Sequence, residues 1–147
     1  MINIAISYFY RIRFFTPTMV PLSTAMWDPD WFHKEGAVYI DKRGIINGYK
    51  FQLFVPTCHD CRGPAHCLQS PETCSFLRSY KEQLDKLDFC VIMRMLENIV
   101  NNTKVILDIK EELTLVLMVY EPPYKLCSER GPLVAWFKEH GYDLKEV

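Results

Sequence analysis

The run from Leu113 to Tyr120 constrains the fold of this chain more than any other segment. It is apolar at every position except Thr114, and it is far shorter than the roughly 20 residues that cross a membrane. A strand that is apolar on both faces is typical of the centre of a parallel sheet, where helices cover both sides. The run therefore predicts an α/β protein with a buried central strand.

Strands and helices are predicted around that centre. Short apolar segments bounded by turn residues predict strands at 1–9, 38–40, 49–55 and 142–147. Helical spacing of apolar residues predicts helices at 75–87, from about Asp88 to Asn101-Asn102, and from 131 or 132 to 140. The stretch 103–111 fits a helix or a connector. Three prolines, Pro17, Pro21 and Pro29, predict an ordered loop.

These elements predict one domain over residues 1–147, which is enough chain for one core. Their order predicts a three-layer α/β fold, in which a mixed, mostly parallel sheet is flanked by helices. A cysteine-rich loop at 56–74 forms a small insert in this domain, with the character of a zinc knuckle.

Four of the six cysteines lie in that insert, with the spacing Cys58-x2-Cys61-x5-Cys67-x6-Cys74. A C-x2-C pair supplies two thiolates from one tight turn, and two further thiolates complete the tetrahedral shell that zinc prefers. The spacing therefore predicts a structural zinc site with these four ligands. His59 or His66 replaces one cysteine in a second possible ligand set. The same cysteines would otherwise form disulfides, hold an iron–sulfur cluster or stay unconnected thiols.

The cysteines also bear on the compartment. The chain starts without a recognisable secretory signal and has no membrane-length apolar run, so we expect it in the reducing cytoplasm, where clustered cysteines bind metal more often than they form disulfides. The formal net charge of −1 argues against a protein that coats nucleic acid or a membrane, but it allows a local basic patch. Cys90 is expected in the core, beside the apolar stripe of its helix.

A candidate ligand site follows the central strand. Ligands of open α/β sheets bind beyond the carboxyl ends of strands, and helix starts offer N–H groups to anions. Glu121 stands at that strand end, and Cys127, Ser128 and Arg130 stand where the last helix begins. A thiol beside a helix start and an arginine is favoured as a nucleophile. Alternatively, Ser128 caps the helix and Arg130 pairs with Glu121 or Glu129.

The stretch LVLMVYEPPYKLCSERGPLVAWFKEHG resembles the C-terminal signature of the bacterial and phage family catalogued as domain of unknown function 488. Members of that family end with a hydrophobic strand, an acidic residue, a short loop, a Cys-His-Arg motif and a helix. The resemblance implies an α/β fold and matches Glu121, Cys127 and Arg130 to the motif, with Ser128-Glu129 in place of the single His. A strand followed by an ordered loop makes the N-terminal part similar as well.

Polar residues also follow other predicted strands: Arg11 and Arg13, then Ser23, Thr24, Trp27 and Asp28, then Asp41 and Arg43. If the sheet is parallel here, these groups converge with the 121–130 segment. Arginines bind phosphate, and Trp27 or Trp31 would stack on a base. The alternative is that the tryptophans pin the proline-rich loop to the core while the charged groups are solvated.

The chain lacks the usual phosphate-loop, dinucleotide and hydrolase motifs. We therefore expect a small zinc-stabilised protein that binds a nucleotide or a nucleic-acid base at the strand carboxyl ends. An enzyme that processes nucleotides or glycosidic bonds is one form of this function, with Glu121 as acid/base or ribose contact, Cys127 and Ser128 as nucleophile or loop donors, and Arg11, Arg43 and Arg130 as anion clamps.

The alternative function is a non-catalytic module that binds a ligand or a protein partner, such as a phage-encoded interaction protein. A hydrogen-bonded pair of Glu121 with Cys127 or Ser128 would favour the enzyme. An Arg130 locked in an ion pair, with an exposed apolar rim around the zinc loop, would favour the module. Whether the chain is an enzyme is left open by the sequence.

Overall fold

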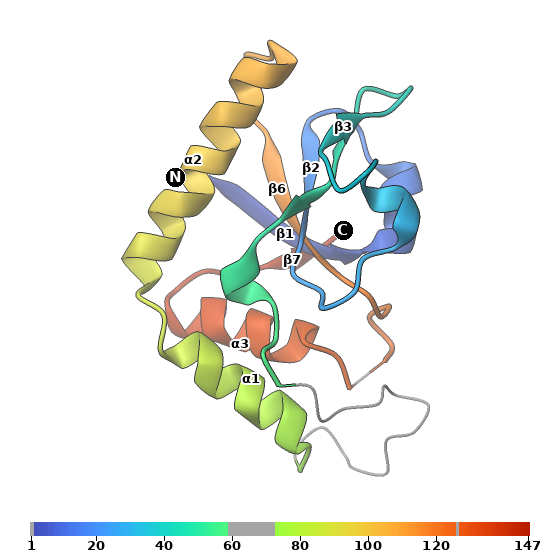
Figure 1. Ribbon diagram of the computed structural model, residues 1–147. Coiled ribbons are helices and arrows are strands. Elements are labelled where there is room, and N and C mark those ends of the chain that lie inside the picture. Colours follow the sequence, from blue (N-terminus) through green and yellow to red (C-terminus); the bar gives the residue numbers. More distant parts are fainter. Residues whose placement is uncertain (1, 59–72, 126) are drawn as a thin grey trace.

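The computed structural model describes residues 2–58, 73–125 and 127–147. Its main sheet has five strands in the order β5-β2-β6-β1-β7, and each described pair is parallel (Figure 1). Their bounds are β1 Asn3–Tyr8, β2 Met19–Ser23, β5 Tyr49–Lys50, β6 Thr114–Val119 and β7 Lys145–Glu146. Helical segments cover both faces, so the predicted three-layer α/β fold with a mostly parallel sheet is confirmed.

β6 lies between β1 and β2 at the centre of the sheet, as its apolar sequence predicts. Leu115, Leu117 and Val119 pack into the hydrophobic core on one face, and Val116 and Met118 pack into the core on the other. All of these side chains are buried, and the burial of each stabilises the folded state by roughly 1.5–3 kcal/mol. β6 therefore joins the two cores.

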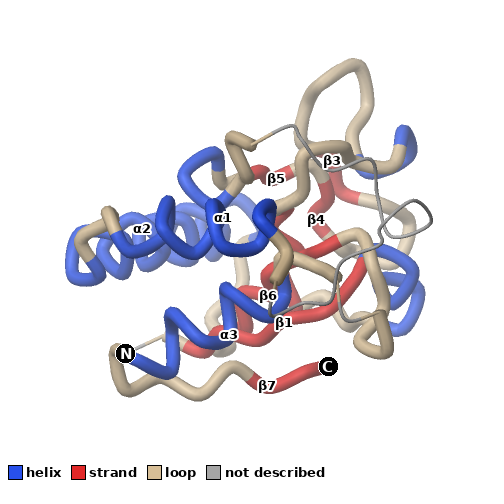
Figure 2. Tube along the Cα trace, turned by 90° about the horizontal axis from the view of Figure 1, so that it is seen from below, coloured by secondary structure: helices blue, strands red, loops and turns tan. Residues whose placement is uncertain are grey.

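Three α-helices cover one face of the sheet: α1 Ser75–Asp85, α2 Phe89–Leu107 and α3 Arg130–Glu139 (Figure 2). Each turns an apolar stripe into the core on that face, where α1 packs against α3, and this burial is the reason that the spacing located the helices. Gly141, with φ of 80°, follows α3 as the predicted C-terminal signal. Among the described helices, none is long and apolar enough to cross a bilayer.

α2 begins where the sequence predicts and ends later. The Asp88 carboxylate caps its start by accepting bonds from the N–H groups of Cys90 and Val91. The predicted end at Asn101-Asn102 is wrong, because both asparagines are exposed and their weak helix propensity costs little there. The prediction that Cys90 is a core residue is also wrong: it precedes the buried Ile92 by two residues, roughly 200° around the helix, and it is exposed.

Shorter elements cover the other face. They are the 3-10 helices η1 Phe9–Phe14 and η2 Asp30–Phe32 and the antiparallel hairpin of β3 Tyr39–Ile40 and β4 Ile46–Asn47. Their apolar side chains form the second core against β6, and they include Phe9, Ile12, Phe32 and Ile45. The prolines in these segments interrupt helices, so the helices on this face are short.

β2 occupies part of the segment for which the prolines predict a loop. The Thr24 N–H donates to the Met118 carbonyl of β6 at 3.0 Å, and N–H groups alternate sides along a strand. The Pro21 nitrogen therefore points away from β6, toward the side where β5 pairs only with Leu22 and Ser23. A proline is tolerated there because no long partner strand needs its missing N–H.

The predicted strand at 49–55 is wrong beyond Lys50, where a 3-10 turn, η3 Gln52–Phe54, replaces it. Residues three apart lie on the same side of a 3-10 turn, and the rings of Phe51 and Phe54 pack at 4.8 Å. Both rings then enter the same core. A strand would place these rings on opposite faces.

Candidate functional site

The carboxyl ends of the strands share one edge of the sheet because every described pair is parallel. Ser23, Lys50 and Glu146 end β2, β5 and β7, and Glu121 follows β6 by two residues. Most of the predicted site residues, but not Arg11, fall into three groups at or beside this edge.

The first group, the Asp28 cluster, contains Ser23, Asp28 and Lys50. Ser23 donates its hydroxyl hydrogen to Asp28 Oδ1 and accepts a bond from the Ala25 N–H at 3.2 Å. Lys50 Nζ lies 3.5 Å from Asp28 Oδ2. These polar atoms bind one another, so Ser23 and Asp28 hold the loop after β2 in place. Trp27 beside them is exposed, and sequence reasoning missed Lys50.

The second group surrounds the start of α3. Arg130 Nε donates to Glu146 Oε1 at 2.8 Å, and Arg130 Nη1 donates to the Glu121 backbone oxygen at 2.8 Å. Ser128 Oγ accepts a bond from the Arg130 N–H at 3.1 Å. The N-cap residue of α3 is Glu129, whose side chain makes no capping bond, so Ser128 is not the N-cap that the sequence suggests, although it binds the first N–H of the helix. Arg130 ties α3 to β7 and to the end of β6. The alternative that Arg130 forms an ion pair is met, but its partner is Glu146 and not Glu121 or Glu129.

Two carboxyl groups beside Arg130, those of Glu121 and Glu129, form a carboxyl pair. Glu129 is only 7% exposed, and one oxygen of each carboxyl, Glu121 Oε2 and Glu129 Oε1, is buried without a partner. Burial raises the pKa of Glu129 to about 8, and the charge of Glu121 adds to this rise. Glu129 also adds to the rise that burial causes in the pKa of Tyr80 on α1. Sequence reasoning missed Glu129 because burial is not visible in sequence.

The cysteine positions are described only in part. Cys58 and the half-buried Cys127 are described, and Cys74 is buried at the residue before α1. Cys61, Cys67, His59 and His66 lie outside the described residues. Within 2–58, 73–125 and 127–147, no group of three His, Cys, Asp or Glu side chains could hold a metal ion. The zinc site stays a prediction.

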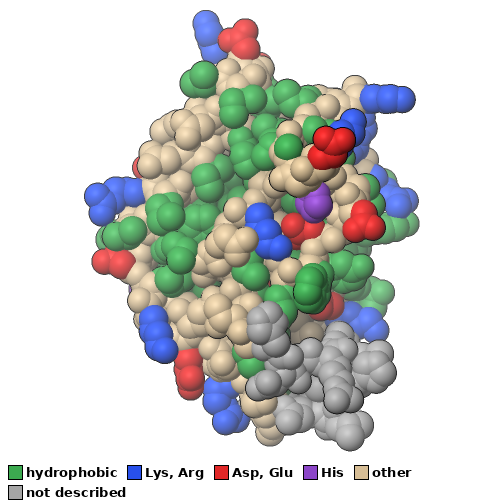
Figure 3. All heavy atoms as spheres, viewed as in Figure 1, with side chains coloured by type: hydrophobic (Ala, Val, Ile, Leu, Met, Phe, Trp, Pro, Cys, Tyr) green, Lys and Arg blue, Asp and Glu red, His purple; other side chains and the backbone are tan. Residues whose placement is uncertain are grey.

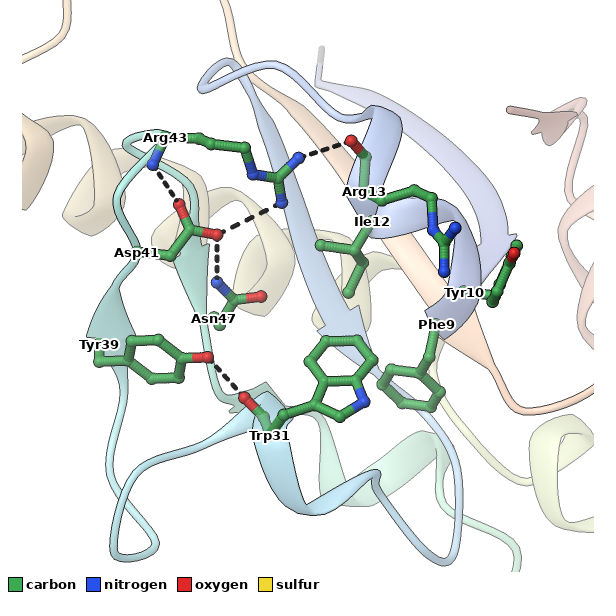
Figure 4. Close-up of a pocket in the computed structure, with 9 residues that line it drawn as sticks. All are labelled: Phe9, Tyr10, Ile12, Arg13, Trp31, Tyr39, Asp41, Arg43 and Asn47. Carbon is green, nitrogen blue, oxygen red and sulfur yellow. Dashed lines mark hydrogen bonds and ion pairs between the residues drawn. The ribbon is translucent and has the colours of Figure 1, made fainter.

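The third group lines a pocket of about 260 Å³ between η1, η2 and the β3–β4 hairpin (Figure 4). We call it the arginine–aromatic pocket. It lies next to the carboxyl end of β1, since η1 follows that strand directly. Its walls are Phe9, Tyr10, Ile12, Arg13, Trp31, Tyr39, Asp41, Arg43 and Asn47.

Asp41 organises the polar side of the pocket. Its carboxylate accepts bonds from the backbone N–H groups of Arg43 at 2.9 Å and Ile45 at 3.1 Å, and from Asn47 Nδ2 at 3.2 Å. Partial burial acts to raise the pKa of Asp41, but these bonds and the Arg43 charge outweigh it and hold the pKa below its usual value. Asp41 is thus an ionised hub that fixes the hairpin turn and Asn47.

Asn47 has one amide atom without a partner. Its Nδ2 donates to Asp41 Oδ2 and to the Ile45 backbone oxygen, both at 3.2 Å. Because both partners are acceptors, the amide cannot be flipped. Oδ1 is therefore directed toward the middle of the pocket (Figure 4), where it is buried without a donor. The side chain as a whole is 1% exposed.

Aromatic rings and guanidinium groups form the rest of the pocket. Trp31 is 51% exposed, and its ring packs edge-on against Phe9 at 6.4 Å. The Arg13 guanidinium lies 3.6 Å from the centre of the Tyr10 ring. Arg43 Nη1 donates to the Arg13 backbone oxygen at 2.7 Å. Flat apolar surface, two cations and a buried acceptor therefore meet in one place.

The structure brings only some of the predicted residues together. Arg13, Asp41 and Arg43 line the arginine–aromatic pocket, whereas Arg11 is half-buried with its guanidinium over the Phe14 ring. The pocket contains none of Ser23, Trp27, Asp28, Glu121, Cys127, Ser128 and Arg130. Sequence reasoning missed Asn47, which stands in a turn signal with Gly48, and it missed Tyr10.

A chain of ring contacts joins the pocket to the second group. Tyr10 stacks on Tyr8 with ring centres 6.5 Å apart, and the Arg130 guanidinium lies 6.0 Å from the Tyr8 ring. The pocket and the carboxyl pair are thus neighbours along the carboxyl edge.

Two other hollows lie toward the amino edge of the sheet. One of about 310 Å³ includes Glu97 and Lys104, and one of about 560 Å³ includes Asp143 and Lys145. Among the described residues, neither hollow is lined by a buried polar atom that lacks a partner. Ligands of open α/β sheets bind at the carboxyl edge, so these hollows are weaker candidates despite their size.

Comparison with known proteins finds no matching family model, no matching curated protein and no matching solved structure. The resemblance to the domain of unknown function 488 therefore stays a prediction.

Proposed function

We propose that this protein binds a nucleotide or a nucleic-acid base in the arginine–aromatic pocket. The observation that carries the proposal is Asn47 Oδ1, an acceptor that is buried, fixed in orientation and without a donor. A buried unpaired acceptor costs about 1–3 kcal/mol. A ligand N–H group that reaches Oδ1 recovers this energy, and each nucleobase carries an N–H on its hydrogen-bonding edge.

The other walls suit the rest of a nucleotide. The Trp31 ring and the Phe9 and Ile12 side chains offer flat or apolar surface to a base. Arg13 and Arg43 bring positive charge, and the Arg43 guanidinium has more N–H groups than its bonds to Arg13 and Asp41 use. Arginine N–H groups match the geometry of a phosphate. The volume of about 260 Å³ suits a single base.

Titration of the protein with the four ribonucleoside monophosphates tests this proposal, with calorimetry as readout. We expect millimolar or tighter binding of at least one of them. Trp31→Leu should weaken it about tenfold by removing a stacking surface, and the exposed Trp27→Leu outside the pocket is the matched control. If adenylate binds, purine riboside monophosphate, which lacks the amino donor, should bind about tenfold more weakly. Binding of none of the four would overturn the proposal.

A second candidate is an enzyme that cleaves a glycosidic bond or processes the bound nucleotide. The carboxyl pair favours it, since a carboxyl with a pKa of about 8 keeps a proton at neutral pH and can serve as a general acid. In this form of the proposal Glu121 is the second carboxylate, and Cys127 is the candidate nucleophile. Release of free base from a bound nucleotide, lost in Glu121→Gln, is the expected result. Binding without turnover would leave the non-catalytic module.

We also propose that Cys58, Cys61, Cys67 and Cys74 bind structural zinc in the reducing cytoplasm. The described ends of the insert support this. The residue before Cys58, Thr57, donates its N–H to Gln83 Oε1 of α1 at 3.0 Å, and Cys74 directly precedes the same helix. One helix therefore anchors both ends of the segment, which a zinc ion would close.

A further inference from the structure

The outer side of η1 carries exposed rings paired with cations. Tyr10 is 58% exposed and Phe14 is 61% exposed. The Arg13 guanidinium lies 3.6 Å from the Tyr10 ring centre, and the Arg11 guanidinium lies 4.8 Å from the Phe14 ring centre. η1, with the sequence FYRIRF, contains no acidic residue. A short segment beside the pocket thus combines positive charge with flat apolar surface.

The Tyr10 and Phe14 rings differ in how much ring surface is left for a ligand. Tyr10 is already in contact with Arg13 and with the Tyr8 ring, and it lines the pocket. The ring contact of Phe14 is Arg11. Because a ring has two faces, Phe14 keeps a surface on which a flat group can stack, and the guanidinium beside it can contact a phosphate.

These features fit a nucleic-acid strand whose bases are unpaired. A duplex hides the faces of its bases, whereas a single strand offers them for stacking and carries a phosphate at each step. Single-strand binding combines cations that follow the backbone with aromatic rings that stack on successive bases. η1 carries both, next to a pocket with room for one base.

We propose that the ligand is single-stranded nucleic acid, with one base in the arginine–aromatic pocket and the adjacent base stacked on Phe14. This inference rests on the proposed function of the pocket. Arg11 and Arg13 contact the phosphate that links these two nucleotides. The strand runs along η1 and not toward Arg130, because the Arg130 side chain is engaged by Glu146 and the Glu121 backbone oxygen.

The helical face supplies the controls. Hydrophobic side chains gather along α2 in Figure 3, with Lys and Arg side chains scattered singly around them. Val105 on α2 is 81% exposed, and Arg94 on the same helix is exposed as well. Val105→Ser and Arg94→Gln replace the same kinds of side chain as Phe14→Ser and Arg11→Gln, an apolar group and an arginine, on the opposite face of the sheet. Val105 is exposed like Phe14, and Arg94 is more exposed than the half-buried Arg11.

The experiment compares affinities for a mononucleotide, for single-stranded hexamers of DNA and of RNA, and for duplex DNA, by fluorescence anisotropy or calorimetry. We expect a hexamer to bind at least tenfold more tightly than the mononucleotide. Its affinity should fall with salt, with a logarithmic slope of about 0.7 for each phosphate contacted. The DNA and RNA arms distinguish which sugar is preferred. The duplex should bind most weakly.

The variants separate this inference from the function of the pocket. Phe14→Ser and Arg11→Gln should each weaken hexamer binding about tenfold or more and leave mononucleotide binding unchanged, while Val105→Ser and Arg94→Gln change neither. Equal affinity for hexamer and mononucleotide, or equal affinity for duplex and single strand, would overturn the inference and leave the pocket proposal intact. A different result would overturn both the pocket proposal and the inference. In it, no mononucleotide binds, and Trp31→Leu does not change the affinity for the hexamer.

Discussion

Two buried polar side chains, Asn47 and Glu129, each have an oxygen without a hydrogen-bond partner. They differ in how that oxygen is compensated. The Asn47 amide is held by Asp41 and the Ile45 backbone oxygen, so its acceptor needs a donor from outside the chain. The Glu129 carboxyl keeps a proton up to about pH 8, because the neutral form costs less to bury than the charged form. A neutral amide thus suits binding, and a protonated carboxyl suits acid chemistry.

The pKa of Glu129 predicts how stability depends on pH. Its value of about 8 in the folded protein lies above the ordinary 4.5, so between these values the folded state holds a proton that the unfolded chain has released. The free energy of unfolding should therefore fall from about pH 5 to pH 8 and level off above, with a contribution approaching about 1.4 kcal/mol per pH unit. Glu129→Gln should flatten this curve and exceed wild type at about pH 8.

Urea unfolding at several pH values measures this effect. Glu82→Gln is the control, because Glu82 is an exposed carboxylate on α1 and should keep the wild-type slope. Parallel curves for wild type and Glu129→Gln would show that Glu129 is ionised in the folded protein.

At the scale of elements, the β3–β4 hairpin positions the pocket. Asp41 accepts three bonds from within the hairpin and binds Arg43 as well. Gly48 follows β4 with φ of 106°, and this backbone passes close to the start of the hairpin. A β-carbon at Gly48 would lie 2.9 Å from Val38 Cα and 3.0 Å from the Ala37 backbone oxygen. The approach of the two hairpin segments therefore needs a glycine beside Asn47.

Gly48→Ala should lower the free energy of unfolding by about 2 kcal/mol or more, because both the close contact and the positive φ oppose the methyl group. Gly131→Ala is the matched control. Gly131 lies in α3 with open space around it, so alanine should stabilise the protein by up to about 1 kcal/mol. Thermal and urea unfolding measure both. A neutral Gly48→Ala would contradict the close approach of the hairpin segments.

At the scale of the whole molecule, the sheet separates two different coverings. Long α-helices with apolar stripes form one face, and short 3-10 helices and the hairpin form the other. The pocket lies on the second face, where loops are free to present polar groups. Both described ends of the cysteine insert lie at α1, since Thr57 binds Gln83 and Cys74 precedes the helix. A zinc ion that held these two ends together would stabilise the fold at α1.

Elemental analysis of purified protein should find about one zinc per chain, and a strong chelator should lower Tm. Cys74→Ser should lose the metal and also lower Tm. Because Cys74 is buried, a serine there also lowers Tm through lost packing, so the zinc content of the variant is the deciding measurement. The exposed Cys90→Ser on α2 should keep both properties. Less than half an equivalent of zinc or iron in fresh protein would refute the metal site.

The sequence by itself determined the elements whose buried side chains recur at a regular spacing along the chain. The apolar run of β6, the stripes of the α-helices and the start of α2 near Asp88 are local patterns, and each was predicted near its observed place. Two shorter elements, β2 and η3, were not predicted. Each depends on tertiary neighbours: Pro21 is tolerated in β2 because of how β5 pairs with that strand, and η3 forms where Phe51 packs on Phe54. Candidate residues were found by type, and three of them, Arg13, Asp41 and Arg43, share the pocket.

Only the tertiary structure decided which of those residues meet and what each is free to do. Asp28 is engaged by Lys50 of β5, and Arg130 is engaged by Glu146 of β7. Asn47 stands out only because two acceptors fix its amide and the hairpin buries it. Burial and hydrogen bonding are properties of the assembled chain, because they depend on groups far apart in sequence that folding brings within a few ångströms.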